Sequence, residues 1–355
     1  MKEIKPLEGI RILDFSRLLP GPLGTHLLSE MGAEVIKIES PKRLDSTRLY
    51  QPKIGENSAI FHLMNYSKES LIIDYETLEG QELVKEKIKT ADVLIEQFRP
   101  GAMASFGFSF EEVKVLNPKI VYISVTGYGQ TGALKDKAGH DINYLALSGL
   151  LDLNRDANGK PVIPGFQIAD IAGGSYMLLS ACTSGLLAQQ RKQQAQYIDL
   201  SILDAIIPMG AVPHALQQGG ASYKATPILS GFLVNYNVYE CKDKKWIALG
   251  ALELKFWNNF CELVQKPGWK ASKESELICG IFDKKKLEDL FREKTRDEWV
   301  ATAKDTDICL SPILSQREVS LQQHMIDRDV FNAISVDEKM IQTYANPFKT
   351  FCEEA

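Results

Sequence analysis

The sequence predicts an α/β protein with two domains: a large Rossmann-like domain containing a parallel sheet, and a smaller α+β domain. Over the first 130 residues, short runs rich in Ile, Val and Leu alternate with helical patterns, as in a parallel sheet covered by helices on both faces. The alternation stops after Gly139, and a hairpin pattern appears near residue 230. A length of 355 residues also favours two domains.

The expected elements of the large domain follow one another in a regular order. Its strand-like runs are nearly continuous in apolar residues, which is typical of strands buried on both faces. Helical patterns separate these runs, and the first of them ends at Gly32. We expect strands over 10–16, 34–40, 70–76, 92–98 and 120–129, and helices over 22–32, 77–91 and 109–118.

The second half of the chain has a different pattern. Residues 170–190 read as a helix rich in small residues, which we expect to be buried, and a strand-like run follows over 196–202. Residues 232–252 read as a hairpin around the polar CKDKK. Helical patterns lie near 253–265 and 286–304, and the tail over 311–331 has no domain pattern of its own. We therefore expect a large domain over 1–200, to which 325–355 returns, a linker over 201–230 and a small domain over 231–324.

The composition excludes several classes of protein. The hydrophobic content of 45%, the charged content of 25% and the net charge of −5 are those of a soluble globular chain and argue against nonspecific nucleic-acid binding. Six scattered cysteines without C-x-x-C spacing argue against a zinc site and favour a reducing compartment. No apolar run appears long enough to cross a bilayer, so we expect a cytoplasmic protein with no membrane segment.

One motif is discounted. GYGQTG, residues 127–132, matches G-x-G-x-x-G and follows a strand. A dinucleotide fingerprint also requires the motif to open an amphipathic helix, whereas the polar ALKDKAGHD follows here. We interpret the motif as a glycine-rich turn that lets the backbone approach a ligand.

Three residues are candidates for chemistry, although each also has an ordinary structural explanation. His140, in GHDINY, lies beyond a strand end, where open α/β sheets bind ligands, but it also fits a surface histidine. Asp170 precedes the small-residue helix, where an aspartate commonly caps a helix and where the helix amides can also bind an anion. Glu253 fits a solvent-exposed residue at a helix start. Together the three would suit proton transfer or acyl transfer.

Longer motifs carry a resemblance to a known family. The stretch LEGIRILDFSRLLPGPLGTHLLSEMGAEVIKIESP resembles the family III CoA-transferase (CaiB/BaiF) superfamily, which also contains the α-methylacyl-CoA racemases. The resemblance extends over essentially the whole chain through SLIIDY, DVLIEQFRPGAM, LNPKIVYISVTGYGQTG, AGHDINYLALSG, ADIAGG, VYECKDKKWIALGALELKFW and DICLSPIL. GHDINYLALSG with GALE looks most like the racemase branch. The segment LSGFLVNYNVYE and Leu254 depart from the racemase pattern.

The resemblance implies a chemistry for the three candidates. In the racemase branch, the residues matching His140 and Asp170 flank the α-carbon of a 2-methylacyl-CoA thioester, and the residue matching Glu253 hydrogen-bonds the histidine. The alternative is a CoA-transferase, in which the carboxylate of Asp170 attacks the thioester and forms an aspartyl-CoA intermediate. Many transferases of the family lack the histidine, so His140 favours the racemase. A CoA-binding protein without turnover is a third alternative.

The resemblance also implies binding residues and partners. It places CoA contacts at Ile72, Ile73, Asp74 and Tyr75, and at Gly139, His140, Asp141, Ile142, Asn143 and Tyr144. Arg99, in FRPG, is a candidate for a phosphate contact and is equally consistent with a surface arginine on a turn. The resemblance implies an interlocked homodimer, in which Glu253 reaches His140 from the partner chain. It implies no cofactor apart from coenzyme A as part of the acyl-CoA substrate, and no metal.

Overall fold

The chain forms two compact units, residues 1–211 with 324–355 and residues 212–323. Each unit has its own hydrophobic core. The large unit therefore contains both ends of the chain. The computed structural model describes residues 2–156, 158–220, 229–278 and 283–353.

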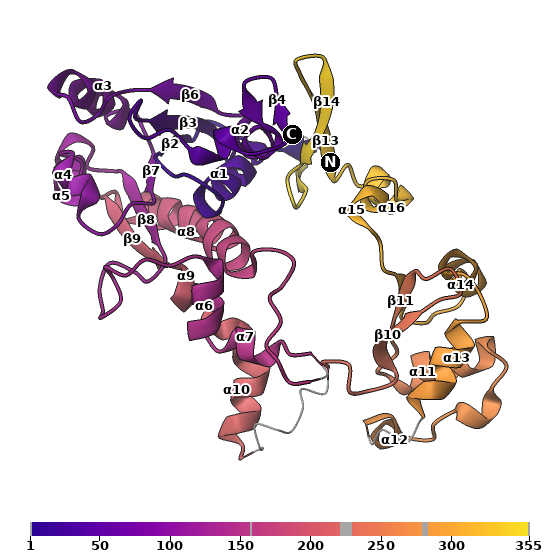
Figure 1. The fold of residues 1–355 in the computed structure, drawn as a ribbon. Helices are drawn as coiled ribbons and strands as arrows, with labels where there is room; N and C mark the ends of the chain where they lie inside the picture. Colours follow the sequence, from indigo (N-terminus) through magenta and orange to yellow (C-terminus); the bar gives the residue numbers. More distant parts are fainter. Residues whose placement is uncertain (1, 157, 221–228, 279–282, 354–355) are drawn as a thin grey trace. The chain divides into compact units, whose positions relative to one another are not determined.

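A six-stranded parallel sheet forms the centre of the large unit (Figure 1). Its strands lie in the order β6–β3–β2–β7–β8–β9, and every neighbouring pair is parallel. Numbered by their order in the chain, they give 3-2-1-4-5-6, which is the Rossmann arrangement. The expected parallel sheet is confirmed, and the run at 196–202 supplies its sixth strand. The strands are β2 (Arg11–Asp14), β3 (Glu34–Glu39), β6 (Glu69–Ile72), β7 (Val93–Glu96), β8 (Val121–Thr126) and β9 (Gln196–Ser201).

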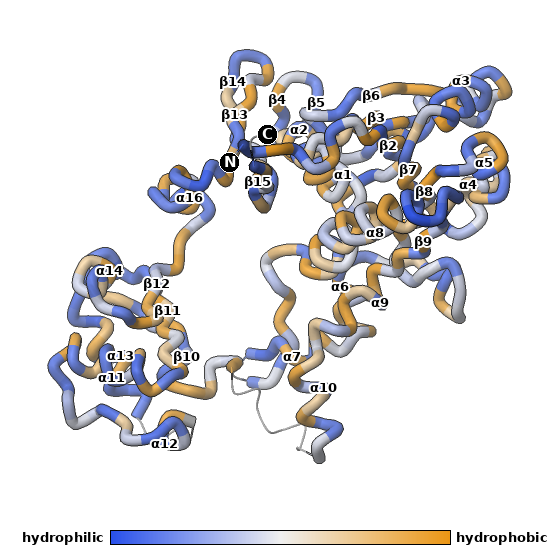
Figure 2. Tube along the Cα trace, turned by 180° about the vertical axis from the view of Figure 1, so that it is seen from behind, coloured by the Kyte–Doolittle hydropathy of each residue, from blue (hydrophilic) through white to orange (hydrophobic). Residues whose placement is uncertain are grey.

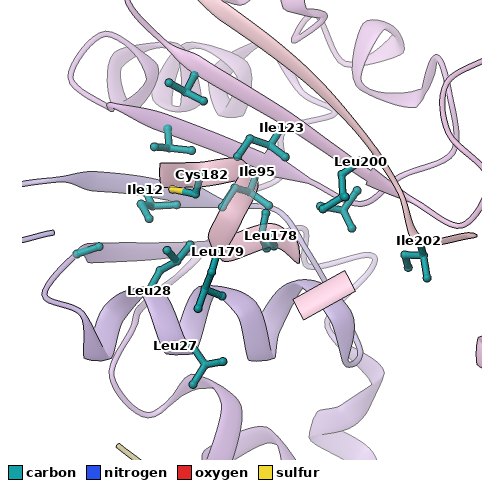
Figure 3. Close-up of a cluster of buried hydrophobic side chains, with 14 of the residues drawn as sticks. Ile12, Leu27, Leu28, Ile95, Ile123, Leu178, Leu179, Cys182, Leu200 and Ile202 are labelled. Atoms are coloured by element: carbon teal, nitrogen blue, oxygen red, sulfur yellow. The ribbon is translucent and has the colours of Figure 1, made fainter. Parts of the chain in front are cut away.

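The central strands are buried on both faces because successive side chains point to opposite sides of the sheet. Ile12 and Ile95 belong to a core on one face, whereas their neighbours Leu13 and Leu94 belong to a core on the other. All four are fully buried. Helices α1 and α8 cover the first face, where their side chains meet those of the strands in Figure 3, and α3 and α5 cover the second. The helices are α1 (Pro20–Glu30), α3 (Leu78–Ile88), α5 (Phe110–Leu116) and α8 (Met177–Lys192).

The small-residue helix starts as a π-helical segment, η2 (Ala169–Tyr176), and continues as α8. Figure 2 shows that α8 is hydrophobic over much of its length. The whole segment Ala169–Lys192 is long and apolar enough to cross a membrane by length and composition alone. Our expectation that no run reaches this length is therefore wrong. Leu178 and Cys182 are nevertheless fully buried against the sheet, as in the core helix of a globular domain.

The chain that follows β9 differs from the linker expected over 201–230. It continues as helical segments, and Ile202 and Ile206 of the first of these are buried in the core that α1 and α8 cover. The large unit therefore extends to residue 211. Residues 221–228 of the expected linker lie outside the described residues. The segments are α9 (Ile202–Ile206), η3 (Ile207–Gly210) and α10 (Ala211–Gln218).

The C-terminal residues pack on the beginning of the chain. Strand β15 (Thr350–Cys352) pairs antiparallel with β1 (Lys2–Ile4). The hairpin of β13 (Phe331–Val336) and β14 (Lys339–Tyr344) packs near α1, where the ring of His26 lies 3.2 Å from the carbonyl of Tyr344. The remaining short elements of this unit are η1 (Ser46–Leu49), β4 (Lys53–Ile54), β5 (Asn57–Ser58), α2 (Ala59–Asn65), α4 (Ala102–Ser105), α6 (Asp141–Leu147) and α7 (Leu150–Leu153), with α16 (Gln323–Asp327) at the unit boundary.

The small unit is an antiparallel sheet packed against helices. The expected hairpin is confirmed by β10 and β11, and β12 adds a third strand. The helix expected over 286–304 is instead two helices, because the side chain of Thr295 accepts the N–H of Glu298 and starts a new helix. Aromatic side chains such as Phe260 and Phe291 fill the core. The elements are β10 (Tyr236–Glu240), β11 (Trp246–Gly250), β12 (Leu310–Pro312), α11 (Leu254–Leu263), η4 (Pro267–Trp269), α12 (Glu274–Ile278), α13 (Lys284–Phe291), α14 (Arg296–Ala303) and α15 (Gln316–Val319).

Candidate active site

A cleft of about 330 Å³ lies at the carboxyl ends of β2, β7 and β8. Its walls include the segments that follow these strands: Arg17 and Leu18 after β2, 97–100 after β7, and 127–128 after β8. The strand order reverses between β2 and β7. Open α/β sheets bind ligands at this point, since the chain leaves adjacent strands in opposite directions and opens a crevice.

His140 lines this cleft from the start of α6. Its backbone is extended, and its N–H donates a 3.0 Å hydrogen bond to the side-chain oxygen of Asn143, so that the residue is fixed at the helix entrance. Behind it, the Tyr144 hydroxyl donates to the carbonyl of Gly139 at 2.8 Å. A Cβ on Gly139 would lie 2.5 Å from the Tyr128 hydroxyl, so the turn needs glycine at this position.

Asp170 lines the same cleft from η2. Its backbone N–H donates to the Asp141 carboxylate at 3.0 Å, which ties the start of η2 to the start of α6. Burial raises the pKa of Asp170 to about 6, the negative charge of Asp141 adds to the rise, and His140 opposes it. A carboxyl group with this pKa can both take up and release a proton near neutral pH.

The lining of the cleft is basic. Four cationic side chains, Arg17, Arg99, Lys135 and Lys137, line it together with a single acidic one, Asp170. This excess of positive charge in a chain of net charge −5 favours an anionic ligand. Sequence reasoning had selected only Arg99 among the four. Arg17 follows a strand end beside the sheet reversal, and that position is the signal that could have identified it.

The structure separates the other expected CoA contacts into two groups. Within GHDINY, Gly139, His140 and Tyr144 line the cleft, while Asp141, Ile142 and Asn143 are not among its lining residues. The segment from Ile72 to Tyr75 begins at the last residue of β6, on the same edge of the sheet but outside the cleft lining.

Two side chains of that second segment already have partners. Tyr75 is buried against Phe15 and Phe106. Asp74 forms an ion pair with Lys42 at 3.1 Å. Ile72, in contrast, is 58% exposed and is free for a contact.

Glu253 belongs to the small unit, where it precedes α11. Its side chain is exposed, and its carbonyl accepts the N–H of Trp257 at 3.1 Å. Glu253 also lies close enough to Cys309 for its charge to raise the pKa of that thiol, to which burial contributes most. These contacts of Glu253 are therefore with residues of the small unit.

The discounted GYGQTG motif forms a turn. Gly129 and Gly132 have φ values of +82° and +83°, and the next helix after β8 begins at Asp141. The motif therefore does not open a helix, which agrees with our interpretation. In the described part of the chain, no three or more His, Cys, Asp or Glu side chains are grouped so as to hold a metal ion.

Known proteins resemble this chain over nearly its full length. The profile of CoA-transferase family III matches residues 7–353. Human succinyl-CoA:glutarate CoA-transferase is 30% identical over 333 residues, covering 92% of this chain and 76% of that protein. Human α-methylacyl-CoA racemase is 31% identical over 332 residues, covering 92% and 82%. A CAIB/BAIF family protein from Brucella suis superposes with a TM-score of 0.82 at 26% identity, covering 98% of this chain and 93% of that one.

Proposed function

The chain belongs to CoA-transferase family III, and on that premise we propose that it is an acyl-CoA racemase that inverts the α-carbon of 2-methylacyl-CoA thioesters. One observation carries the proposal: His140 and Asp170 line the same cleft, and the pKa of Asp170 is raised to about 6. Two proton-exchanging groups in one cleft are what inversion by proton transfer needs.

In this mechanism one base removes the α-proton and the other returns a proton to the opposite face. The C–H electron pair moves into the thioester to form an enolate, and it re-forms a C–H bond when the second base delivers its proton. His140 and Asp170 exchange roles between the two directions, so each must hold a proton in one resting state. The positive lining of the cleft stabilises the developing enolate charge.

The cationic side chains support coenzyme A as part of the substrate. Arg17, Arg99, Lys135 and Lys137 would neutralise phosphate groups, and arginine can do so with paired hydrogen bonds. Ile72 offers an exposed apolar contact at the carboxyl end of β6. No further cofactor takes part in this proposal, and a cytoplasmic location remains a prediction.

CoA transfer between carboxylic acids is the second candidate function. The observation that favours it is that a human CoA-transferase and a human racemase match this chain at almost equal identity, 30% and 31%. In transfer, the carboxylate of Asp170 attacks the thioester carbonyl and expels the CoA thiolate, which then attacks the aspartyl carbonyl of the resulting anhydride and releases the donor carboxylate. An aspartyl-CoA thioester forms and passes CoA to the acceptor acid. His140 has no required part in these steps of CoA transfer, so its presence favours racemisation.

The homodimer expected from the family is part of the proposal. Glu253 and His140 lie in different units of the chain, and in the proposed interlocked dimer Glu253 of one chain hydrogen-bonds His140 of the other. Mixing inactive His140→Ala and Glu253→Gln chains tests this arrangement. Recovery of activity in the mixed dimer supports a shared site, and no recovery contradicts it.

The reaction itself is tested by following α-deuterium uptake from heavy water into (R)- and (S)-2-methylacyl-CoA. We expect exchange from both enantiomers, which is lost or becomes one-sided in His140→Ala and Asp170→Asn. His324→Ala, a histidine of the C-terminal segment, is the matched control and should exchange normally. The absence of exchange, together with a hydroxylamine-sensitive adduct on Asp170, would contradict racemisation and support CoA transfer. Binding without either reaction would indicate a CoA-binding protein without turnover.

A further inference from the structure

A cluster of four buried charges lies directly behind one wall of the cleft. It consists of two ion pairs, Lys37–Asp45 and Lys68–Asp14, each with 3.2 Å between the charged atoms. All four side chains are completely inaccessible to solvent. Buried ion pairs are weak contributors to stability, because the loss of hydration offsets much of their attraction. The cluster therefore needs an explanation other than stability.

The cluster holds the loop that follows β2, residues 16–19. The Lys37 ammonium donates to the carbonyl of Ser16 at 2.8 Å. The Asp14 carboxylate accepts the N–H of Ser16 at 2.9 Å, and the Asp45 carboxylate accepts the N–H of Leu18 at 3.2 Å. The polar backbone groups on both sides of Arg17 are thus fixed by buried charges, and hydrogen bonds to charged groups are the stronger ones.

Leu18 shows that the loop conformation is imposed. Its φ is +66°, in the left-handed region that a leucine rarely adopts because its Cβ crowds the backbone. Such a conformation persists only where the surroundings determine it. The Asp45 bond to the Leu18 N–H supplies part of that constraint. The next residues are fixed as well, since the N–H of Gly21 donates to the side chain of Gln97 at 3.0 Å.

The residue between the two anchored positions is Arg17. Its side chain is partly buried and lines the cleft that contains His140 and Asp170. Within the described ranges its guanidinium has no ion pair and no hydrogen bond. A cleft-lining arginine whose guanidinium has no ion pair and no hydrogen bond is suited to bind a carboxylate or phosphate with two parallel hydrogen bonds.

We propose that the buried cluster positions the 16–19 loop so that Arg17 binds an anionic group of the ligand in the cleft. Arg17 is the ligand-binding residue, and Lys37 and Asp45 are positioning residues that act through it. The inference rests on the proposed function for the identity of the ligand. The anchoring of the loop by Asp45 and Lys37 does not depend on that function.

The experiment compares ligand affinity by calorimetry in three variants. Arg17→Gln removes the cation, and we expect affinity to fall about ten-fold or more, as for the loss of a charged hydrogen bond. Lys37→Met/Asp45→Asn removes both charges of one buried pair at once, which avoids leaving an unpaired charge. This double variant should fold, and like Arg17→Gln it should bind the ligand more weakly than wild type. The combination of all three substitutions should bind no more weakly than Arg17→Gln, because the pair acts through Arg17.

Controls separate positioning from general damage. Arg296→Met/Glu318→Gln removes an ion pair of the small unit, in which the arginine side chain is 5% exposed, and should leave affinity unchanged. Amide hydrogen exchange over residues 16–19 reads the loop without any ligand, and it should accelerate in Lys37→Met/Asp45→Asn but not in this control. Unchanged exchange would overturn the positioning role, whatever the ligand proves to be. Affinity losses that add in the triple variant would overturn the link to Arg17.

Two ligands identify the source of the anion. Coenzyme A carries phosphates, whereas succinyl-pantetheine carries only a carboxylate. A loss in Arg17→Gln that is confined to coenzyme A assigns Arg17 to phosphate, and a loss confined to succinyl-pantetheine assigns it to the acyl carboxylate that the dicarboxylic substrate of a CoA-transferase would carry. A loss with neither ligand, when wild type binds them, contradicts the proposal. If wild type binds neither ligand, the proposed function fails, while hydrogen exchange still decides the positioning role.

Discussion

The carboxylate of Asp141 accepts the backbone N–H of Asp170 at 3.0 Å, and its negative charge is one cause of the raised pKa of Asp170. One side chain thus connects the helix that carries His140 to the segment that carries Asp170. The same contact places the carboxylate of Asp141, which is not itself among the residues that line the cleft, beside Asp170. Asp141 therefore acts on the position of Asp170 and on its proton affinity.

Asp141→Asn should keep the hydrogen bond and remove the charge. The pKa of Asp170 then falls from about 6 toward its ordinary value, although burial still holds it above that value. If Asp170 must be ionised to accept a proton, the acidic limb of the pH–rate profile moves to lower pH. Carbon-13 NMR titration of labelled aspartate measures the same shift without any substrate. An unchanged titration of Asp170 would contradict this role for Asp141.

Glu96 provides a second pH-dependent test. It ends β7 directly before the cleft segment, it is 4% exposed, and its carboxylate accepts the N–H of Phe98 at 2.7 Å. Burial raises its pKa to about 7 from 4.5. The folded protein therefore retains a proton that the unfolded chain has lost between pH 4.5 and 7. The contribution of Glu96 to the free energy of unfolding is therefore fully present below pH 4.5 and is lost as pH rises to 7.

Glu96→Gln removes that dependence and retains an acceptor for Phe98. Relative to wild type, the variant should gain free energy of unfolding as pH rises from 4.5 to 7, by an amount on the order of 3 kcal/mol. Urea unfolding at several pH values measures the difference. Glu86→Gln, on the exposed face of α3, should show no such trend. A difference for Glu96→Gln that does not vary with pH would mean that Glu96 titrates normally.

Lys68→Met tests the buried cluster as a structural element. The substitution leaves the fully buried Asp14 without the ammonium that lies 3.2 Å away. An unpaired buried charge costs about 3 to 5 kcal/mol, and chemical denaturation of the large unit should show this loss. Lys68→Met/Asp14→Asn should recover much of it, because no charge is then left alone. A loss below about 1 kcal/mol in the single variant would mean that the carboxylate finds another partner.

Gly139→Ala tests the turn that presents His140. The added methyl would lie 2.5 Å from the Tyr128 hydroxyl, so the ring must move or the turn must shift. Overpacking of this kind costs about 1 to 3 kcal/mol. A shift of the turn should also lower the rate of α-deuterium exchange into the acyl-CoA substrate, which depends on His140. At Gly165 a Cβ meets no atom within 4 Å, so Gly165→Ala should be close to neutral in thermal unfolding. Equal effects of the two substitutions would contradict the packing argument.

The sequence by itself determined the strands of the parallel sheet, the helices α1, α3, α5 and α8 that cover it, and the order in which they follow one another. The strands of that sheet could be predicted because buried parallel strands need continuous runs of Ile, Val and Leu, and such runs are visible locally, as in 92–98 and 120–129. Gly32 and the small-residue run after Asp170 marked helix boundaries for equally local reasons. The family was also recognisable from linear motifs, since a motif is a property of neighbouring residues. His140, Asp170 and Arg99 were selected in the same way.

What only the tertiary structure decided is which of these residues meet. Lys37 had no distinguishing sequence signal, and the action of Asp141 on Asp170 was not visible in the sequence, because these contacts join residues 21 and 29 positions apart along the chain. The helices inside the expected linker were missed for a related reason, since α9 is stabilised by burial of Ile202 and Ile206 in the core of the sheet. The raised pKa of Asp170 comes from burial and from the neighbouring charge of Asp141. Both arise only when the chain brings distant segments into contact, so no local pattern can encode them.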